Sequence, residues 1–380
     1  MDIPLDYATM KVIWWALVGV LFIAYAVTDG YDLGVATLLP FVGKTDDERR
    51  LVINSIGPMW EGHQVWLITA GGALFAAWPY VYAISFSGFY LAMFVVLAAL
   101  ILRPVGFKYR SKRASKQWRR NWDWALFIGG FVPALIFGVA LGNVLQGVPF
   151  DIDRTMRATY DGGLLGLLNP FALLAGLASV AMLVVHGASW LVVKIEHGPV
   201  MDRAIRYGRL AAIAVIAFYA LAGIWLWQSG MGYRIVSDID PHGQANPLRK
   251  EVITEAGAWM GNYVKYPFLL LAPIAGFGGS LLALWALGRK SPLALLGSGV
   301  AAAGIVGSVG ASMFPFILPS SANPSVSLTV WDSSSSHITL FIMLIATAIF
   351  LPIVLAYTAW VFKVLWGRIT VEEATGEGKY

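Results

Sequence analysis

The chain has no cysteine among its 380 residues and few charged ones, since Asp, Glu, Lys and Arg together make up only 13% of it. The lack of cysteine excludes disulfides, Cys-ligated iron–sulfur clusters and structural zinc sites of the thiolate type. Two aspartates precede the first apolar run, where a signal peptide would carry a basic segment, so we expect that run to be a retained span. Hydrophobic residues form 58% of the chain, which is typical of a polytopic membrane protein.

Nine segments are apolar and long enough to cross a bilayer, which takes about 20 residues. They lie at 12–34, 61–78, 82–103, 123–146, 164–193, 209–229, 266–287, 293–317 and 337–362. The expected fold class is therefore all-α, with nine transmembrane helices forming two four-helix bundles plus one extra helix. We expect a single integral membrane domain over residues 1–380, with a periplasmic loop at 230–265 and a short cytoplasmic tail at 369–380.

Basic residues predict the orientation of these spans. With the N-terminus outside, the inner loops hold 20 of the 27 lysines and arginines, as the positive-inside rule requires. The inner cluster at 108–120 is expected to meet anionic lipid, and no nucleic-acid partner is expected.

Five ionisable residues are predicted to lie at similar depth in the first three spans. Asp29 follows Lys11 by 18 residues, a rise of about 27 Å on a helix, which places it near the inner edge of the hydrocarbon. The same arithmetic puts Asp32, Glu61, His63 and Arg103 at that edge. Because charges in hydrocarbon are costly and rare, each is a candidate functional residue.

Two interpretations of this layer remain open. Asp29, Asp32 and Arg103 could form an inner-edge polar network with a function. Alternatively, the network could be only a structural ion-pair cluster. Glu61, beside two tryptophans at the start of a helix, is the better candidate for carrying protons. His63 comes two residues after Glu61 and therefore points elsewhere on a helix, so we do not expect it to be a direct relay partner.

His63 and His186 are weak candidates for haem ligation. A lone histidine inside a membrane more often bonds a neighbouring helix. No two histidines are spaced for a shared metal, so we expect no protein metal site and no catalytic residue in this chain.

Several longer motifs occur in a characteristic order. They are Thr28-Asp29-Gly30-Tyr31-Asp32-Leu33-Gly34, Asp47-Glu48-Arg49-Arg50, Asn54-Ser55-Ile56-Gly57-Pro58, Trp60-Glu61-Gly62-His63-Gln64-Val65-Trp66-Leu67-Ile68, Phe75-Ala76-Ala77-Trp78-Pro79, Arg103-Pro104-Val105-Gly106-Phe107, Gly142-Asn143-Val144-Leu145-Gln146-Gly147-Val148-Pro149-Phe150, Met313-Phe314-Pro315-Phe316 and Leu328-Thr329-Val330-Trp331-Asp332. By these motifs the chain resembles, from end to end, subunit II of the cytochrome bd-type quinol oxidases.

The resemblance implies a respiratory enzyme complex of the bacterial inner membrane that oxidises quinol and reduces oxygen to water. It places haem b, haem d and the quinol-oxidising loop in a partner, subunit I, which leaves this chain haem-free. It assigns proton access to the position of Glu61 and oxygen access to that of Trp66. A bound quinone and a small single-helix accessory subunit are also compatible with the resemblance.

Two other classes of function stay open at this point. Inner-edge carboxylates and nine spans would also suit a proton-coupled secondary transporter, although such carriers place their acids near the midplane. A purely structural partner of a haem protein would need none of these residues for chemistry.

Overall fold

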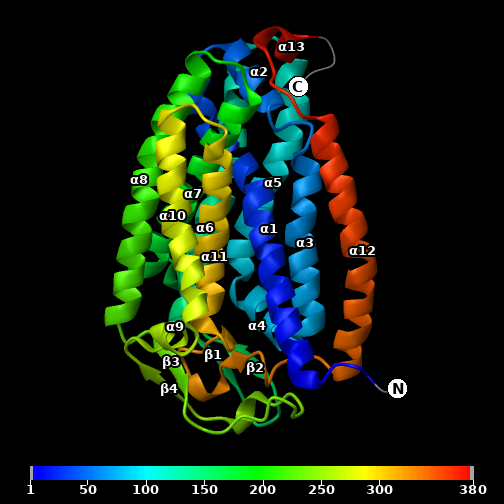
Figure 1. The fold of residues 1–380 in the computed structure, drawn as a ribbon, viewed down its shortest axis with the longest axis vertical. Helices are drawn as coiled ribbons and strands as arrows, with labels where there is room; N and C mark the ends of the chain where they lie inside the picture. Colours follow the sequence, from blue (N-terminus) through cyan, green and yellow to red (C-terminus); the bar gives the residue numbers. More distant parts are fainter. Residues whose placement is uncertain (1–2, 377–380) are drawn as a thin grey trace.

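The structure, a computed structural model, describes residues 3–376, and long helices dominate it (Figure 1). The long helices are α1 (Tyr7–Val42), α3 (Trp60–Ala77), α5 (Tyr90–Tyr109), α6 (Lys116–Gln146), α7 (Pro170–Lys194), α8 (Pro199–Gln228), α10 (Leu271–Gly288), α11 (Leu293–Met313) and α12 (His337–Val364). Shorter helices are α2 (Asp46–Asn54), α4 (Pro79–Gly88), α9 (Gly261–Lys265) and α13 (Val371–Thr375).

Small antiparallel pairs of strands are the non-helical part of the fold. They join β1 (Phe150–Ile152) to β2 (Ala158–Tyr160), β3 (Gly232–Ile235) to β4 (Val252–Glu255), and β5 (Phe316–Leu318) to β6 (Leu328–Thr329). The first two pairs lie at one end of the molecule, called the hairpin end below, and α2 and α13 lie at the other, called the α2 end (Figure 1).

Eight helices within the described residues are long and apolar enough to cross a membrane, which confirms an all-α polytopic membrane protein. They are α1, α5, α6, α7, α8, α10, α11 and α12, with α5 counted through Lys112 and α10 from Pro267. The predicted span 61–78 forms α3, which has 18 residues but is not among the eight. Its first two turns contain Glu61, His63 and Gln64, which lower its hydropathy.

Segment boundaries differ most in the third predicted span. The segment 82–103 is divided between α4 and α5, which meet at Phe89. A side chain at Gly88 would collide with the Tyr160 ring, so the chain passes close to β2 at this break. The hydropathy of 82–103 contains no sign of the break, because apolar residues lie on both sides of it.

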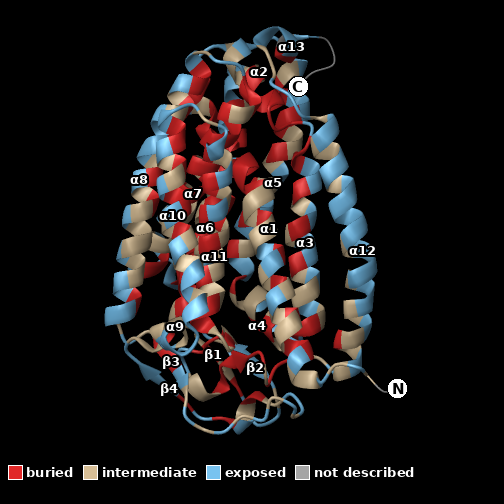
Figure 2. Ribbon diagram, viewed as in Figure 1, coloured by how far each residue is buried: buried red, intermediate tan, exposed pale blue. Residues whose placement is uncertain are grey.

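Helix packing divides the long helices into two groups of neighbours. In one group α1 contacts α3 and α6, and α6 contacts α5; in the other α7 contacts α8 and α11, and α10 contacts α8 and α11. The two groups join where α1 and α6 pack against α7. Helix α12 lies at the edge, packs on α1 and α3, and is largely exposed (Figure 2).

The loop predicted at 230–265 contains β3, β4 and α9 and forms part of the hairpin end. Lys11 of α1 donates hydrogen bonds through Nζ to the carbonyl oxygens of Pro241 and Trp331 at 2.9 and 2.8 Å. Lys250 pairs through Nζ with Asp332 at 2.6 Å. Burial lowers the pKa of Lys250, and the Asp332 carboxylate opposes that shift. These contacts tie the loop to α1 and to the segment before α12.

The α2 end is held by short helices with well-formed caps. Thr45 and Glu48 form a capping box at the start of α2. Partial burial raises the pKa of Glu48, but hydrogen bonds from Arg203 and from the Lys44 and Thr45 amides outweigh it and lower the pKa overall. Within the predicted tail, α13 packs against α2, and the Asn54 amide donates to the Ala374 carbonyl at 3.3 Å. The last residues of the tail, 377–380, lie outside the described residues.

Glycines allow α1 and α7 to approach closely beside the charged segment of α1. A Cβ at Gly34 would lie 1.9 Å from the Leu183 carbonyl oxygen, and one at Gly187 would lie 2.4 Å from the Gly34 carbonyl carbon. These contacts are with backbone atoms, which cannot move aside as a flexible side chain could. The two helices must separate if either glycine is replaced.

We expect Gly34→Ala to lower the stability of the assembled protein by about 1–3 kcal/mol, because it overpacks this helix contact. Thermal unfolding of the purified complex would measure the loss. Gly19→Ala on the same helix is the matched control, since nothing lies within 4 Å of a Cβ there. Equal stability of the two variants would contradict the close α1–α7 contact.

Candidate functional site

A buried ion pair joins α1 to α5. Asp29 and Arg103 are both fully buried, and Arg103 donates from both terminal nitrogens to the two Asp29 oxygens at 3.1 and 2.9 Å. This two-bond geometry is the strong form of an arginine–carboxylate pair. Gly129 of α6 makes room for it, since a Cβ there would lie 2.9 Å from Cγ of Arg103.

Asp32 belongs to the same cluster and brings a histidine into it. It lies three residues after Asp29, on the same side of α1, and its Oδ2 is 3.9 Å from the nearer Arg103 nitrogen. The His63 Nδ1 approaches Asp32 Oδ2 at 2.6 Å. The structure thus joins Asp29, Asp32, His63 and Arg103, which are four of the five residues predicted to lie at one depth.

Tyr31 extends the cluster and was not foreseen from the sequence. Its hydroxyl lies 3.2 Å from Nε2 of His63, and its ring stacks on Trp190 of α7 with centroids 4.1 Å apart. The only signal in the sequence was its place between Asp29 and Asp32 in a short polar segment. We refer to Asp29, Tyr31, Asp32, His63 and Arg103 as the buried charged cluster.

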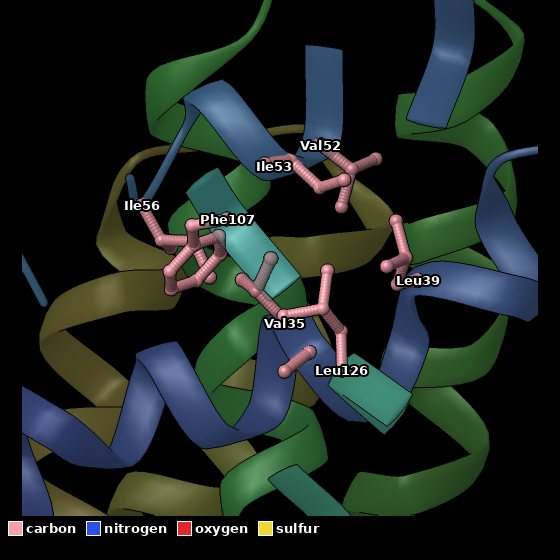
Figure 3. Close-up of a pocket in the computed structure, with 8 residues that line it drawn as sticks. Val35, Leu39, Val52, Ile53, Ile56, Phe107 and Leu126 are labelled. Carbon is pink, nitrogen blue, oxygen red and sulfur yellow. The ribbon is translucent and has the colours of Figure 1, made fainter. Parts of the chain in front are cut away.

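Apolar side chains of α1, α2, α5 and α6 line a small interior space on the α2-end side of this cluster (Figure 3). Val35 lies one turn beyond Asp32 on α1, and Phe107 lies one turn beyond Arg103 on α5. With Ile56 and Leu126 they line an interior space with no volume for a water molecule. The cluster is therefore not in water-filled contact with the α2 end through this space.

Helix α3 has two faces with different surroundings. His63, Trp66 and Ala70 are buried, whereas Glu61 and Ile68 are exposed. The exposed face continues with helical spacing through Val65, Gly72 and Phe75, so Glu61 is the one charged side chain on an otherwise apolar stripe.

Glu61 does not join the buried charged cluster. No hydrogen bond or ion pair links its side chain to another described residue. The expectation from depth alone was that it would lie near Asp29 and Asp32. Depth fixes the position along the membrane normal but not the direction around the helix, and Glu61 points away from α1.

The other two candidate residues are enclosed by the chain. Trp66 is 6% exposed and packs with Leu21, Tyr25 and Ala70, with Leu351 of α12 nearby. His186 is buried, with Nδ1 2.8 Å from the Ser298 hydroxyl and Nε2 2.7 Å from the Val27 carbonyl. Both nitrogens of His186 are thus used to join neighbouring helices.

We expect Arg103→Ala to destabilise the protein by about 3–5 kcal/mol, because it leaves the buried Asp29 carboxylate without its partner. Thermal unfolding and the yield of assembled complex would both report the loss. Arg120→Ala is the control, since it removes the same charge from an exposed position near the α2 end. The double variant Asp29→Leu with Arg103→Met should recover most of the stability, because it removes both charges and keeps the volume.

If Arg103→Ala is as stable as the Arg120→Ala control, the Asp29–Arg103 pair contributes nothing to the stability of the protein. A double variant no better than Arg103→Ala would locate the effect in packing of the arginine rather than in its charge.

Comparison with known proteins gives consistent results over nearly the whole chain. Residues 10–365 match the family described as "Cytochrome bd terminal oxidase subunit II". The chain is 49% identical to "Cytochrome bd-I ubiquinol oxidase subunit 2" of Escherichia coli (strain K12), covering 97% of each. It is 49% identical to "Probable cytochrome oxidase subunit 2" of Haemophilus influenzae, covering 96% of each.

More distant similarity extends to another protein and to a solved structure. "Cytochrome bd ubiquinol oxidase subunit 2" of Bacillus subtilis is 29% identical, covering 96% of this chain and 98% of the relative. A chain in the structure of bd oxidase from Geobacillus thermodenitrificans superimposes with a TM-score of 0.64 at 14% identity, over 94% of this chain and 98% of that one, which supports the fold. The chain belongs to the cytochrome bd terminal oxidase subunit II family and is a subunit of a respiratory quinol oxidase.

Proposed function

We propose that this chain is the haem-free companion of a haem-bearing subunit I and gives that subunit access to protons and oxygen. The complex would oxidise quinol and reduce oxygen to water. The observation that carries the proposal is the position of Glu61, a carboxylate on the exposed apolar face of α3. A charge on such a face is unfavourable against lipid, so a protein partner or a water path is expected to cover it.

The proposed topology has nine crossing helices, with α3 as the ninth in addition to the eight apolar ones. Support comes from its length of 18 residues and from its course beside α1 (Figure 1). The α2 end would face the cytoplasm and the N-terminus the outside of the bacterial inner membrane, because most basic residues belong to the loops at the α2 end. The helices would form two bundles of four, with α12 as the extra helix.

Three of the five histidines of this chain already use ring nitrogens for contacts within the chain, which does not suit haem ligation. His63 and His186, which are both buried, use both ring nitrogens for hydrogen bonds within the chain. The Nε2 of His337 approaches the Leu5 carbonyl at 2.8 Å. Haem b and haem d are therefore assigned to the partner subunit, and no step of the mechanism proposed for this chain runs through them.

We expect the isolated chain, purified without its partner, to bind no haem. An optical spectrum with haem extraction would measure the content, and the spectrum of the intact complex is the positive control. Stoichiometric haem on the isolated chain would contradict the assignment, and loss of that haem in His186→Gln or His63→Gln would then identify the ligand.

Proton access follows from the place of Glu61 along and around α3. It lies in the first turn of the helix, at the level where the membrane meets the α2 end. Oxygen reduction consumes protons, and an oxidase that generates a potential takes them from the cytoplasm. A carboxylate at that edge, on the face open to a partner, can pass protons across the subunit boundary.

Oxygen access is proposed for Trp66 on the opposite face of α3. Its ring lies among Leu21, Tyr25 and Leu351 at the contact of α1, α3 and α12. Oxygen is apolar and concentrates in lipid, so an apolar contact at the edge of the chain suits its entry. Helix α12 lies at the edge of the chain and most of its residues are exposed, which favours the same route.

A bound quinone and a small single-helix accessory subunit complete the proposed complex. An apolar cavity of about 600 Å³ lies between α6, α7, α8 and α11, with Tyr219 and Tyr263 among its polar groups. Its size and lining suit an isoprenoid tail with a polar head group. The accessory subunit rests on the family resemblance alone.

We expect Glu61→Gln to slow oxygen reduction and potential generation by roughly 100-fold, the lower end of what a general acid–base group contributes. Haem content and reduction of the haems by quinol should stay close to those of the parent. Glu61→Asp should keep much of the activity, because the proposed role needs an ionisable carboxyl group. Oxygen consumption and voltage-sensitive dyes in proteoliposomes would measure both effects.

Glu196→Gln is the matched control, since it makes the same change at an exposed glutamate near the α2 end. Parental turnover in an assembled Glu61→Gln complex would mean that Glu61 is structural and that protons enter through the partner subunit. The chain would then be a purely structural companion.

A further inference from the structure

Three buried groups form a hydrogen-bonded chain next to the ion pair of Asp29 and Arg103. Asp32 Oδ2 lies 2.6 Å from Nδ1 of His63, and Nε2 of His63 lies 3.2 Å from the Tyr31 hydroxyl. Asp32 is fully buried, and His63 and Tyr31 are each 3% exposed. Neither the path through Glu61 nor the oxygen route uses these groups.

The charges of the buried charged cluster sum to zero only when the hydrogen-bonded groups Asp32, His63 and Tyr31 hold one extra proton. Asp29 and Asp32 are two carboxylates, and Arg103 is one guanidinium. With His63 neutral the cluster carries one net negative charge, and with one more proton on His63 it carries none. A net charge is expensive in a buried apolar environment, so the low-dielectric surroundings favour the neutral form.

The surrounding elements offer no other charge to replace that proton. On α1 the additional titratable group is Tyr25, whose phenol interacts with the Asp29 carboxylate and brings no charge of its own. Helix α7 contributes His186 and Trp190, helix α12 contributes Phe362, and Trp60 covers Arg103. His186 bonds only neutral groups, the Ser298 hydroxyl and the Val27 carbonyl.

We propose that Asp32 and His63 form a second proton-binding site, separate from Glu61, that loads and releases one proton, with the Tyr31 hydroxyl as its terminal contact. In the loaded state Nδ1–H of His63 donates to Asp32 and Nε2–H donates to the Tyr31 oxygen. On release the Nε2 proton passes to bulk solvent, Nδ1 keeps its own, and the Tyr31 O–H rotates to donate to Nε2. The cluster thereby changes from neutral to one net negative charge.

The proton would be held in the protein interior rather than at the surface, because the groups that bind it are buried and apolar residues lie next to them (Figure 3). On the α2-end side, Val35, Ile56 and Phe107 line a space that is too small for a water molecule. Use of the stored proton in oxygen reduction rests on the proposed function. The binding of the proton does not, and it can be measured without turnover.

The test is isotope-edited infrared difference spectroscopy of the resting, purified complex between acidic and alkaline pH, with 15N-labelled histidine. We expect an imidazole signal that shifts with the label and is lost in His63→Gln. His186→Gln is the matched control, because it removes the other buried histidine, which has no carboxylate partner. It should leave the signal unchanged.

Tyr31→Phe provides a second variant if His63→Gln fails to assemble, with assembly judged by the haem spectrum of the complex. It removes the group bonded to Nε2 but not the Asp32 partner, so the imidazole signal should remain and shift in frequency. If the imidazole signal of Tyr31→Phe is identical to that of the parent, the proposed hydrogen-bonded chain of Asp32, His63 and Tyr31 is wrong. So would a parental histidine signal in His63→Gln, or its loss in His186→Gln.

The Glu61→Gln variant separates this inference from the proposed function. It should retain the His63 signal whether or not it slows oxygen reduction. If Glu61→Gln turns over normally and the signal is present, the proton-access role of Glu61 fails while the proton-binding site stands. If the signal disappears with Glu61→Gln, the two sites are one and the inference is wrong.

Discussion

Two adjacent turns of α1 place the carboxylates of Asp29 and Asp32 in the interior of the helix bundle. The positions of the neighbouring helices follow from the need to balance these two negative charges. Arg103 meets Asp29 with two hydrogen bonds, which requires α5 to stand beside α1 and Gly129 of α6 to make room. Asp32 then needs His63, which fixes the rotation of α3 about its axis. Three helices are oriented by one constraint, since an unbalanced buried charge would cost several kcal/mol.

The orientation of α3 has a consequence on its opposite side. Residues two apart on a helix point in nearly opposite directions, so turning His63 towards α1 turns Glu61 outwards. The buried and exposed titratable groups of this helix are therefore set by one rotation. This links the structural role of the cluster to the proposed proton path, because the same contact that pairs Asp32 with His63 leaves Glu61 on the exposed face.

Much of this could be predicted from the sequence, and the failures have physical causes. Apolar length located the helices, and a rise of 1.5 Å per residue placed Asp29, Asp32 and Arg103 at one depth, where the structure joins them. Depth does not give the direction of a side chain around the helix axis, so Glu61 was expected in the same cluster. Tyr31 was not predicted, because composition gives no reason to single out one tyrosine. The break at Phe89 depends on a distant contact of Gly88 with Tyr160, which local hydropathy cannot register.

The central claim is that the exposed stripe of α3, with Glu61 at its end, is the face that subunit I covers. An experimental structure of the intact complex in lipid tests it most directly. The account predicts that Glu61, Val65 and Ile68 lie against the haem-bearing subunit, with the Glu61 carboxylate in contact with its polar groups or with water between the chains. A structure in which this stripe meets lipid and subunit I occupies another face would contradict it.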